Sequence, residues 1–450
     1  MFFKRVETKS LAHYSYMVGD DGSIAVIDPM RDVGVYMHEA RKAGMKIACI
    51  FETHRNEDFL VGSRELSEKT GAAIYLSGHE DLNYEYGEKI TEGFELELGK
   101  IRLKALHTPG HTLGHLSYIL YEKDREEAYM AFTGDCLFMG GLGRTDFYGR
   151  ENLEKMTSLL YDSVFNKLLP LGDMVLLFPA HGAGSACGDS MDKREYSTLG
   201  YERATNGDLR TESKEEFLRK FARMRIKPRY FNAMEERNLK GVPFSGGDIL
   251  LNPLTLDEFK RVKDEALVID IRTKEGFAGG HIPGSIYMPK GLLSSFLGAI
   301  YQTDEKILFV TDGAMDDVEE VYWYARRMGF DNILGYLPNG VGQWEKSGEE
   351  PEQLETITAK ELKDLPRDGE FILLDIRKRD EIEADDPEKN RINIPLQNIY
   401  KCLEHLVYDR PIYVLCESGE RSTIGASYLK ARKYDARVVS GGIEMFEALE

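Results

Sequence analysis

The sequence predicts an α/β protein built from several domains, and three observations support this prediction. Its 450 residues exceed the roughly 100 to 200 residues of a typical single domain. Short β-branched runs alternate with turn residues and helical stretches, which is the pattern of strand and helix units. The second part of the chain also repeats itself at a fixed offset, as tandem domains do.

Composition and charge exclude several classes of protein. The chain is 42% hydrophobic and 30% charged, as in ordinary globular proteins. Its net charge of -19 repels nucleic acids and anionic membranes, so we expect neither as a partner. No apolar run approaches the ~20 residues of a spanning helix, and no export signal follows Met1. Five scattered cysteines argue against a disulfide framework. We therefore expect a cytoplasmic protein.

Residues 1–243 are predicted to form a strand-rich first domain. Several of its predicted strands end at a histidine or an aspartate, and loops at sheet ends commonly carry functional sites in α/β folds. The charged residues 195–238 have helical periodicity and are expected to pack on this domain as terminal helices. The predicted strands are 23–28, 45–53, 101–107, 116–121, 128–135 and 174–181.

The rest of the chain is predicted to be two related α/β domains, at 250–350 and 355–450. Ala266–Arg272 is echoed by Phe371–Arg377, with Asp270 and Asp375 separated by 105 positions, and the same offset relates 307–310 to 412–415. Turn formers at 241–247 and 346–353 separate the domains. Buried strands followed by helical patterns predict a parallel sheet in each domain.

Three strand-end loops of the first domain offer metal-binding side chains, and we predict His54, His111 and Asp135 as ligands. Two imidazoles and one carboxylate can hold one face of an octahedral Fe(II), which leaves open positions for dioxygen and substrate. Taken singly, each residue also has an ordinary structural interpretation as a hydrogen-bonded group at a strand end.

The order of these motifs, with Ile27–Asp28–Pro29 before them and Pro179–Ala180–His181–Gly182 after them, resembles the metallo-β-lactamase superfamily. The resemblance implies an αββα sandwich. Hydrolytic members hold two metals through a T-H-x-H-x-D-H motif, and this chain has Asn56 and Phe59 in place of the second and third histidines. A two-zinc cluster would lose one ligand from each metal and with it the bridging hydroxide.

The remaining ligand set is similar to that of the persulfide dioxygenase branch of the superfamily, which this chain also resembles at 134–138 and 143–147. That branch holds a single iron, so the resemblance implies one Fe(II) per chain on His54, His111 and Asp135. The competing interpretation is a decayed domain without a metal.

Five other residues of the first domain have weaker assignments. Asp58 is expected to orient a ligand or a water molecule. Arg144 is a candidate for binding the carboxylate of a thiol substrate, with a structural salt bridge as the alternative. His181 binds the second metal in binuclear relatives, so here it is expected to support the site or the fold. His107 is expected to be a structural hydrogen bonder and Cys187 a buried thiol.

Cys416 lies directly after a buried strand and before the helical run 423–433. Backbone N–H groups at a helix N-terminus and the charge of Arg421 would stabilise an anionic persulfide there. The motif C-x-x-G-x-R-S resembles the active loop of rhodanese sulfurtransferases, and Asp375–Ile376–Arg377 matches their upstream strand end. The alternative is an inert buried cysteine.

The middle domain carries the other rhodanese signature, Gly280–Ser285, but has Thr311 where the nucleophile would be. Threonine cannot carry a persulfide, and Asp316 and Asp317 would repel an anionic one. This domain is therefore expected to be an inactive spacer or interface. The last domain has the cysteine but reads Arg391–Leu396 in place of the Gly280–Ser285 signature.

The order of domains resembles bacterial persulfide dioxygenase and rhodanese fusions. This resemblance implies oxidation of a small thiol persulfide, such as glutathione persulfide, by dioxygen to sulfite, and sulfur transfer at Cys416 that interconverts persulfide and thiosulfate. Two alternatives remain: a binuclear zinc thiolester hydrolase resembling glyoxalase II, and a non-catalytic sulfur carrier with a vestigial metal domain. Homo-oligomers are common among such proteins, so we expect one here.

Overall fold

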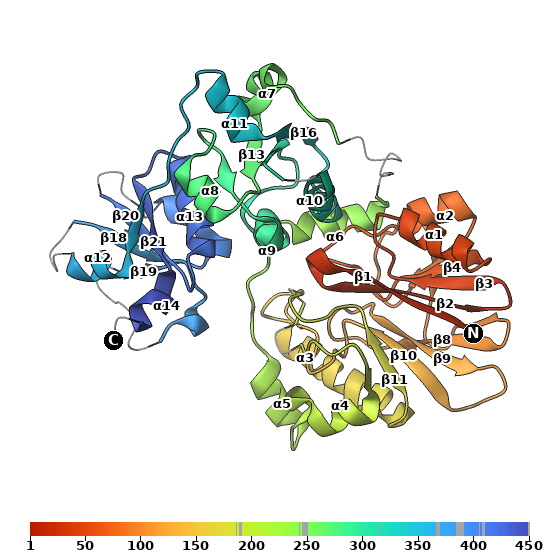
Figure 1. Cartoon of the computed structure of the whole chain (residues 1–450). Helices are drawn as coiled ribbons and strands as arrows, with labels where there is room; N and C mark the ends of the chain where they lie inside the picture. Colours follow the sequence, from red (N-terminus) through yellow and green to blue (C-terminus); the bar gives the residue numbers. More distant parts are fainter. Residues whose placement is uncertain are drawn as a thin grey trace. The chain divides into compact units, whose positions relative to one another are not determined.

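The computed structural model describes residues 1–185, 187–188, 191–242, 244, 251–313, 315–365, 370–383, 391–404, 406 and 410–448. The chain divides into two compact units: Met1–Lys227 with Phe231–Gly247, and Pro228–Tyr230 with Asp248–Glu450 (Figure 1). Among the described helices, none combines the length and the apolar character needed to cross a lipid bilayer.

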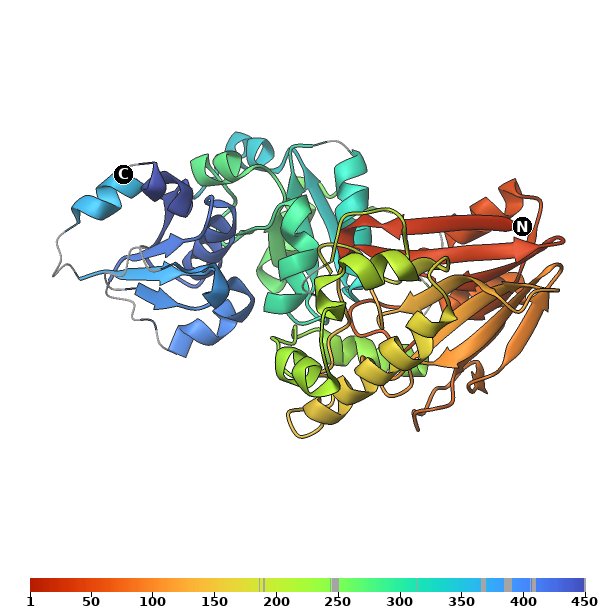
Figure 2. The ribbon, with the colours of Figure 1, turned by 90° about the horizontal axis from the view of Figure 1, so that it is seen from below.

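The first unit is a sandwich of four layers, with two six-stranded sheets face to face and helices on the two outer faces. Figure 2 shows the red strands of the first sheet and the orange strands of the second as separate layers. Side chains from both sheets form the core between them. A second apolar cluster lies under α1 and α2, and a third lies under α3, α4 and α5.

The first sheet has the strand order β1-β2-β3-β4-β5-β6. Its strands β1 to β3 are antiparallel, and β3 to β6 are parallel. The strands span β1 Phe2–Thr8, β2 His13–Asp20, β3 Ser23–Ile27, β4 Lys46–Phe51, β5 Ala73–Ser77 and β6 Glu88–Ile90.

The second sheet has the strand order β12-β11-β10-β9-β8-β7. All its neighbouring strands are antiparallel except β10 and β11, which are parallel. The strands span β7 Glu95–Leu98, β8 Ile101–His107, β9 Leu116–Glu122, β10 Ala128–Gly134, β11 Leu176–Pro179 and β12 Ser197–Thr198.

Alternation along the strands explains why the sheets bury two faces. In β9, Leu116, Tyr118 and Leu120 face the core between the sheets, whereas Ile119 packs in the cluster beneath the outer helices. Successive side chains of a strand point to opposite faces, so a strand with apolar residues at every position suits a layer that is covered on both sides. The helices of this unit are α1 Gly34–Lys42, α2 Ser63–Thr70, α3 Leu153–Tyr161, α4 Leu199–Thr205, α5 Lys214–Phe221 and α6 Phe231–Lys240.

The second unit contains two parallel sheets. The first has the order β14-β13-β15-β16, and the second has the order β17-β21-β20-β18-β19. The strands are β13 Leu267–Asp270, β14 Ile286–Tyr287, β15 Ile307–Thr311, β16 Ile333–Pro338, β17 Thr356–Thr358, β18 Ile372–Asp375, β19 Arg391–Asn393, β20 Ile412–Leu415 and β21 Ala436–Ser440.

The helices of the second unit are α7 Leu256–Val262, α8 Lys274–Gly279, α9 Lys290–Ile300, α10 Met315–Arg327, α11 Gly340–Lys346, α12 Ala359–Asp364, α13 Glu420–Lys430 and α14 Gly442–Glu447. Most of them lie between consecutive strands, whereas α7 precedes β13 and α14 follows β21. The order of strands is the same in the two sheets: β14-β13-β15-β16 in the first corresponds to β19-β18-β20-β21 in the second. The sequence repeat is therefore a repeat of structure.

The predicted fold class, an αββα sandwich followed by two domains with parallel sheets, is confirmed. The predicted strands of the first domain are observed as β3, β4, β8, β9, β10 and β11. Most end one or two residues before the predicted limit, because Asp28, Asp135 and His181 already belong to the loops. Pro243 and residues 245–250, where the first domain boundary was predicted, lie outside the described residues.

Candidate metal centre

The loops that follow β4, β8 and β10 bring His54, His111 and Asp135 together inside the first unit. All three side chains are buried. The Nε2 atom of His111 lies 3.5 Å from Oδ2 of Asp135, and Nε2 of His54 lies 3.9 Å from the same oxygen. The residues predicted as ligands are thus neighbours in space.

Two residues that sequence reasoning did not assign to the site fix the orientation of His54. The Thr53 hydroxyl donates a hydrogen bond to Oδ2 of Asp28 at 2.8 Å. Its oxygen lies 2.8 Å from Nδ1 of His54, so Nδ1 is the donor of that bond and Nε2 keeps its lone pair. Burial holds the pKa of His54 well below its usual value. A neutral ring with a free Nε2 is the form that binds a metal.

His111 is held in the same way by a backbone carbonyl. Its Nδ1 donates to the carbonyl oxygen of Arg144 at 2.9 Å, which leaves Nε2 as the acceptor that faces the centre. Gly143 makes this approach possible, because a Cβ atom there would lie 1.8 Å from the carbonyl oxygen of Asp135 and 3.3 Å from Nδ1 of His111.

Asp135 divides its two oxygens between support and the centre. Oδ1 accepts a hydrogen bond from Nδ1 of His181 at 2.7 Å. Oδ2 has no hydrogen-bond partner among the described residues and faces His54 and His111. The backbone N–H of Asp135 donates to Nε2 of His115 at 3.0 Å, and burial lowers the pKa of His115 to about 3.

The structure adds Glu57, which sequence reasoning missed. Its carboxylate is fully buried, and Oε2 lies 3.5 Å from Nε2 of His111 and 3.8 Å from Nε2 of His54. The available signal was a carboxylate between the candidate ligand His54 and Asp58, in a loop predicted to reach the site. The donor atoms of His54, Glu57 and His111 lie within 4.8 Å of one another.

A metal ion fits this arrangement. Nε2 of His54, Nε2 of His111, Oδ2 of Asp135 and both carboxylate oxygens of Glu57 are buried and lack hydrogen-bond partners among the described residues. Such orphaned polar atoms are costly unless something between them binds them. Donors about 2.1 Å from a common ion lie roughly 3.0 to 3.5 Å apart, and the observed separations of 3.5 to 3.9 Å are close to that range.

A second position lies beside the first, where the donor atoms of Asp58, His181 and Cys187 are within 4.8 Å of one another. His181 lies between two carboxylates, with Nδ1 2.7 Å from Asp135 and Nε2 3.0 Å from Oδ2 of Asp58. Burial alone would favour the neutral ring, but these carboxylates hold the pKa of His181 well above its usual value. The side-chain amide of Asn56 donates to the His54 carbonyl at 3.3 Å, and the Phe59 ring packs 4.2 Å from the His13 ring.

The other residues named from the sequence lie beside the cluster. Arg144 forms a bidentate pair with Asp146, at 2.7 and 2.9 Å. The guanidinium that was a candidate for binding a substrate carboxylate is therefore already paired with a side chain. Cys187 is buried next to the cluster, and burial raises the pKa of its thiol well above the usual value. Nε2 of His107 contacts the Leu113 carbonyl at 2.9 Å.

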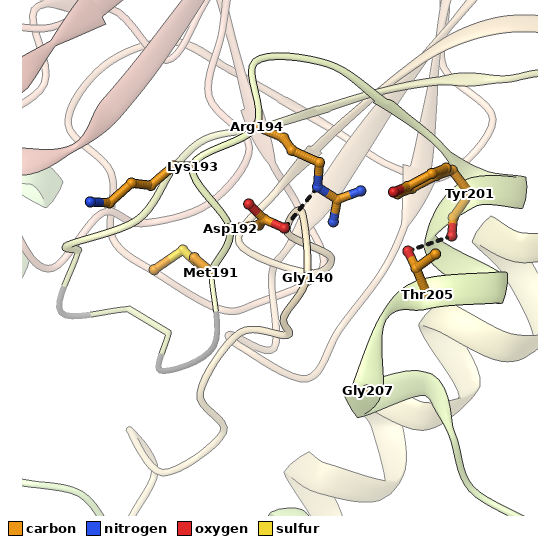
Figure 3. Close-up of a pocket in the computed structure, with 8 residues that line it drawn as sticks. All are labelled: Gly140, Met191, Asp192, Lys193, Arg194, Tyr201, Thr205 and Gly207. Carbon is orange, nitrogen blue, oxygen red and sulfur yellow. Dashed lines mark hydrogen bonds and ion pairs between the residues drawn. The ribbon is translucent and has the colours of Figure 1, made fainter.

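A surface pocket of about 570 Å³ also lies on the first unit (Figure 3). Arg194 and Asp192 pair across it at 2.9 Å. The residues that line this pocket are all different from those of the buried cluster. The pocket is therefore separate from the candidate metal centre.

In the second unit, the loop from Cys416 to Ser422 wraps around the cysteine sulfur. The backbone N–H groups of Gly419 and Ser422 point at Sγ, at 3.2 and 3.3 Å. Gly419 adopts a φ of 96°, in the left-handed region that favours glycine. The side chain of Cys416 is buried, with 1% of the residue exposed. The start of α13 thus forms a cradle suited to a sulfur anion.

Arg421 does not present a free guanidinium to this loop. Its Nη1 and Nη2 donate to the two oxygens of Glu381 at 2.9 and 2.6 Å. The equivalent of Cys416 in the preceding domain is Thr311, whose hydroxyl accepts a hydrogen bond from the Gly313 N–H at 2.8 Å. Asp317 pairs with Lys290 at 2.8 Å, and the side chain of Asp316 lies outside the described residues.

Comparisons with known proteins identify the same parts. A model described as the metallo-beta-lactamase superfamily matches residues 9–181, and a model described as the rhodanese-like domain matches residues 255–347 and 358–449. A solved metallo-beta-lactamase from Staphylococcus aureus is 30% identical, with a TM-score of 0.67, and the match covers 75% of this chain and 98% of that one.

Curated relatives of the metal domain fall into two groups. The chain is 29% identical over 214 residues to the hydroxyacylglutathione hydrolase GloC of Haemophilus influenzae, which covers 43% of this chain and 91% of that protein. It is 32% identical over 176 residues to the mitochondrial persulfide dioxygenase ETHE1 of Mus musculus, which covers 37% of this chain and 63% of that protein.

Proposed function

This chain belongs to the metallo-β-lactamase superfamily and carries two rhodanese-like domains after its metal domain, and from this premise we propose a mononuclear iron persulfide dioxygenase coupled to a sulfurtransferase. It is an enzyme of a family that includes hydrolases and persulfide dioxygenases at similar identity. The choice between these two activities therefore rests on the donor atoms of the metal site. The proposed substrates are dioxygen and a small thiol persulfide such as glutathione persulfide.

The number of donor atoms left for a metal carries the proposal. His181 is held between Asp58 and Asp135, Asn56 is turned towards a backbone carbonyl, and Phe59 offers no donor. A second metal would have to break the pairs of His181, and a buried ion pair that loses one partner costs about 3 to 5 kcal/mol. The other donor at that second position is Cys187, and burial raises the pKa of its thiol well above the usual value, which disfavours the thiolate that binds metals. These features favour a single ion, which lacks the metal-bridging hydroxide of binuclear hydrolases.

The proposed oxidation converts a thiol persulfide, dioxygen and water into a thiol, sulfite and two protons. Bound Fe(II) would supply the redox chemistry of dioxygen activation and a site for the persulfide sulfur. His54 and His111 would contribute Nε2 atoms, since their Nδ1 atoms are held by Thr53 and by the Arg144 carbonyl. The buried surroundings exclude bulk water, which protects a reactive substrate from side reactions.

The proposed transfer takes place at Cys416. Its thiolate attacks the sulfane sulfur of thiosulfate, the bond between the two sulfur atoms of thiosulfate breaks, and sulfite leaves with the bonding electron pair. The product is a Cys416 persulfide, and the reverse step uses sulfite to form thiosulfate. The N–H groups of Gly419 and Ser422 already point at the cysteine sulfur, where negative charge is carried throughout the exchange.

Metal analysis combined with oxygen uptake tests the dioxygenase. The protein is purified anaerobically, its iron and zinc are counted, and oxygen uptake and sulfite are measured with glutathione persulfide. We expect one iron per chain and one sulfite per dioxygen. Two zinc ions per chain with thiolester hydrolysis would replace the proposal by the hydrolase that the GloC relative suggests. A metal-free protein that still labels at Cys416 would leave only a sulfur carrier.

Substitution of the cysteine tests the division of labour. Cys416→Ser should abolish thiosulfate sulfurtransferase activity and leave persulfide-dependent oxygen uptake unchanged, because the two chemistries use different residues. Cys49→Ser is the matched control, since Cys49 is equally buried but lies in the core between the two sheets of the first unit. Loss of both activities in Cys416→Ser alone would contradict the proposal.

A further inference from the structure

The Glu57 carboxylate is buried beside the two imidazole nitrogens that face the centre. The residue is fully buried, and neither oxygen has a hydrogen-bond partner among the described residues. Its nearest ionisable neighbours are Nε2 of His111 at 3.5 Å and Nε2 of His54 at 3.8 Å. These nitrogens are also the atoms that hydrogen bonds on the far side of each ring leave free.

Arg55, the nearest arginine in sequence, forms no ion pair with Glu57 among the described residues, although its charge acts on this carboxylate. Its guanidinium lies 4.0 Å from Glu80 and 3.6 Å from Glu235. Burial of a carboxylate is costly unless a cation contacts it. A divalent ion among Glu57, His54, His111 and Asp135 would contact it directly.

We propose that Glu57 is a fourth protein ligand, so that the iron is held by two imidazoles and two carboxylates. This inference rests on the proposed iron site and deepens it. Four protein ligands would leave an octahedral ion two open positions, which suffice for dioxygen and the persulfide sulfur. The added carboxylate makes the donor set harder and so suits Fe(II) better than a thiolate-rich site would.

Glu57→Gln tests the proposal because the amide has the same shape and no charge. We expect iron affinity, measured by chelator competition, to fall by more than the roughly 10- to 100-fold that loss of an outer partner costs. We also expect the visible absorption spectrum of the Co(II)-loaded protein to change, since its coordination changes. The metal-free variant should be at least as resistant to denaturant as the metal-free parent, because a buried charge has been removed.

Glu52→Gln is the matched control. Glu52 is also buried, but its carboxyl accepts a hydrogen bond from Tyr86 at 3.0 Å and makes no contact with the cluster. It should leave iron affinity and the Co(II) spectrum unchanged. Equal affinity and an identical spectrum in Glu57→Gln would overturn the proposal while leaving the iron site intact. A parent protein without iron would instead refute the site itself.

A different observation concerns the role of the domain that lacks a cysteine. Lys274, the first residue of α8 in that domain, donates a hydrogen bond from Nζ to the carbonyl oxygen of Ser418 at 3.3 Å. Ser418 belongs to the loop around Cys416. Tyr287 of the same domain donates to Glu420 of the loop at 2.7 Å. Both domains lie within the second compact unit.

The charges of the Cys416 loop make this lysine important. Glu417 and Glu420 are acidic, and the one arginine of the loop, Arg421, is neutralised by Glu381. Lys274 forms no ion pair with a carboxylate among the described residues, although its ammonium reaches the loop. An anionic sulfur donor approaching Cys416 therefore meets Lys274 as the uncompensated cation.

We infer that Lys274 binds the anionic sulfur donor for Cys416, so that the cysteine-less domain completes the transfer site. The inference rests on the proposed sulfur transfer. The interaction of Lys274 with the donor should contribute what a partly exposed charge contributes, up to about 1 kcal/mol, which is roughly a fivefold change in binding.

Lys274→Gln should raise the KM for thiosulfate roughly fivefold, leave kcat nearly unchanged and weaken the dependence of KM on salt. Lys274→Arg should restore most of the affinity. Lys306→Gln is the control, because Lys306 pairs with Glu265 at 2.9 Å, away from the loop. An unchanged KM and salt dependence in Lys274→Gln would overturn this inference, whereas inactivity of the parent protein would refute sulfur transfer itself.

Discussion

Thr53 has no role as a metal ligand, yet it determines which form of His54 the centre receives. Its hydroxyl donates to Asp28 and therefore has to accept from Nδ1 of His54. The ring is left with a lone pair on Nε2, directed at Glu57 and Asp135. Supporting partners of this kind raise ligand basicity and restrict the ring to one orientation.

We expect Thr53→Val to lower iron affinity roughly 10-fold or more, measured by chelator competition. The substitution keeps the shape of the side chain but removes both hydrogen bonds, and Asp28 then loses a partner. Thr70→Val is the control, since Thr70 bonds only within the end of α2 and its neighbouring turn. Unchanged affinity in Thr53→Val would mean that the ring is oriented by packing alone.

At the level of residues, the sequence predicted the site residues that stand at motif positions. It did not predict those whose role depends on how the folded chain packs. His54, His111 and Asp135 stand at motif positions, and the fold brings them together. Glu57 occupies a variable position of its motif, and a glutamate is normally expected at the surface. Lys274 reaches Ser418 across 144 positions of sequence, and such a contact cannot be derived without the packing of the two domains.

At the level of elements, the strands that the sequence revealed are all interior strands. β3, β4, β8, β9, β10 and β11 have neighbours on both sides, so their apolar runs are continuous. The four edge strands of the first unit, β1, β6, β7 and β12, were not singled out. β7 reads Glu95–Leu96–Glu97–Leu98, and charged residues of this kind are how edges avoid pairing with other chains. β2 and β5 are interior but short of continuous apolar sequence.

The start of α14 packs closely against the backbone of the Cys416 loop. Gly442 has a φ of 60°, and a Cβ atom there would lie 2.2 Å from the carbonyl oxygen of Glu417 and 2.4 Å from that of Cys416. The N–H of Ile443 donates to the Cys416 carbonyl at 3.0 Å. The chain thus needs a glycine where this helix meets the loop.

Gly442→Ala should lower the free energy of unfolding by at least about 1–2 kcal/mol and reduce sulfurtransferase activity, because the loop has to move. Gly291→Ala in α9 is the control, since no atom lies within 4 Å of its added Cβ. That change should be neutral or stabilise the helix by up to about 1 kcal/mol. Denaturant unfolding and thiosulfate assays measure both. Equal behaviour of the two variants would argue against a rigid loop.

His281, in the turn after α8, makes the middle domain sensitive to acid. Its ring stacks on Phe277, with ring centroids 3.9 Å apart, and Nδ1 donates to the Phe277 carbonyl. Burial lowers the pKa of His281 to about 4, so the folded domain resists protonation that the unfolded chain accepts near pH 6.5. The stabilising difference is present above about pH 6.5 and is lost as the pH falls towards 4.

We therefore expect the second unit to lose about 3 kcal/mol from this group between pH 6.5 and 4, observed as a falling denaturant midpoint. His281→Gln, although less stable near neutral pH, should show a shallower fall, because the amide does not titrate. A parallel pH profile for the two proteins would show that other groups govern the acid response.

For the whole molecule, the structure shows two units with separate apolar cores. The 105-residue repeat predicted the two parallel sheets of the second unit, because buried strands with equal spacing imply equal topology. The sequence could not reveal that Pro228–Tyr230 packs with the second unit, since this depends on contacts such as the bond from the Tyr230 N–H to the Gly298 carbonyl at 3.2 Å.

Metal removal should distinguish the units. With iron bound as proposed, chelation would remove the common partner of the buried donors, so the first unit should then unfold at a lower temperature. The second unit should be unaffected, because its cores contain none of these residues. Calorimetry is expected to show two transitions, of which chelation lowers one. A single transition that moves as a whole would show that the units unfold cooperatively.

Cys416 is only 1% exposed, and the loop encloses its sulfur with two N–H groups. A sulfur atom carried there, as proposed, would be shielded from reductants in the surrounding solution. Release to an acceptor then requires the loop to open, so at high acceptor concentration the turnover rate should reach a plateau set by that motion. Small alkylating reagents should modify this thiol faster than large ones. The dependence of the alkylation rate on reagent size therefore reports how often the loop opens.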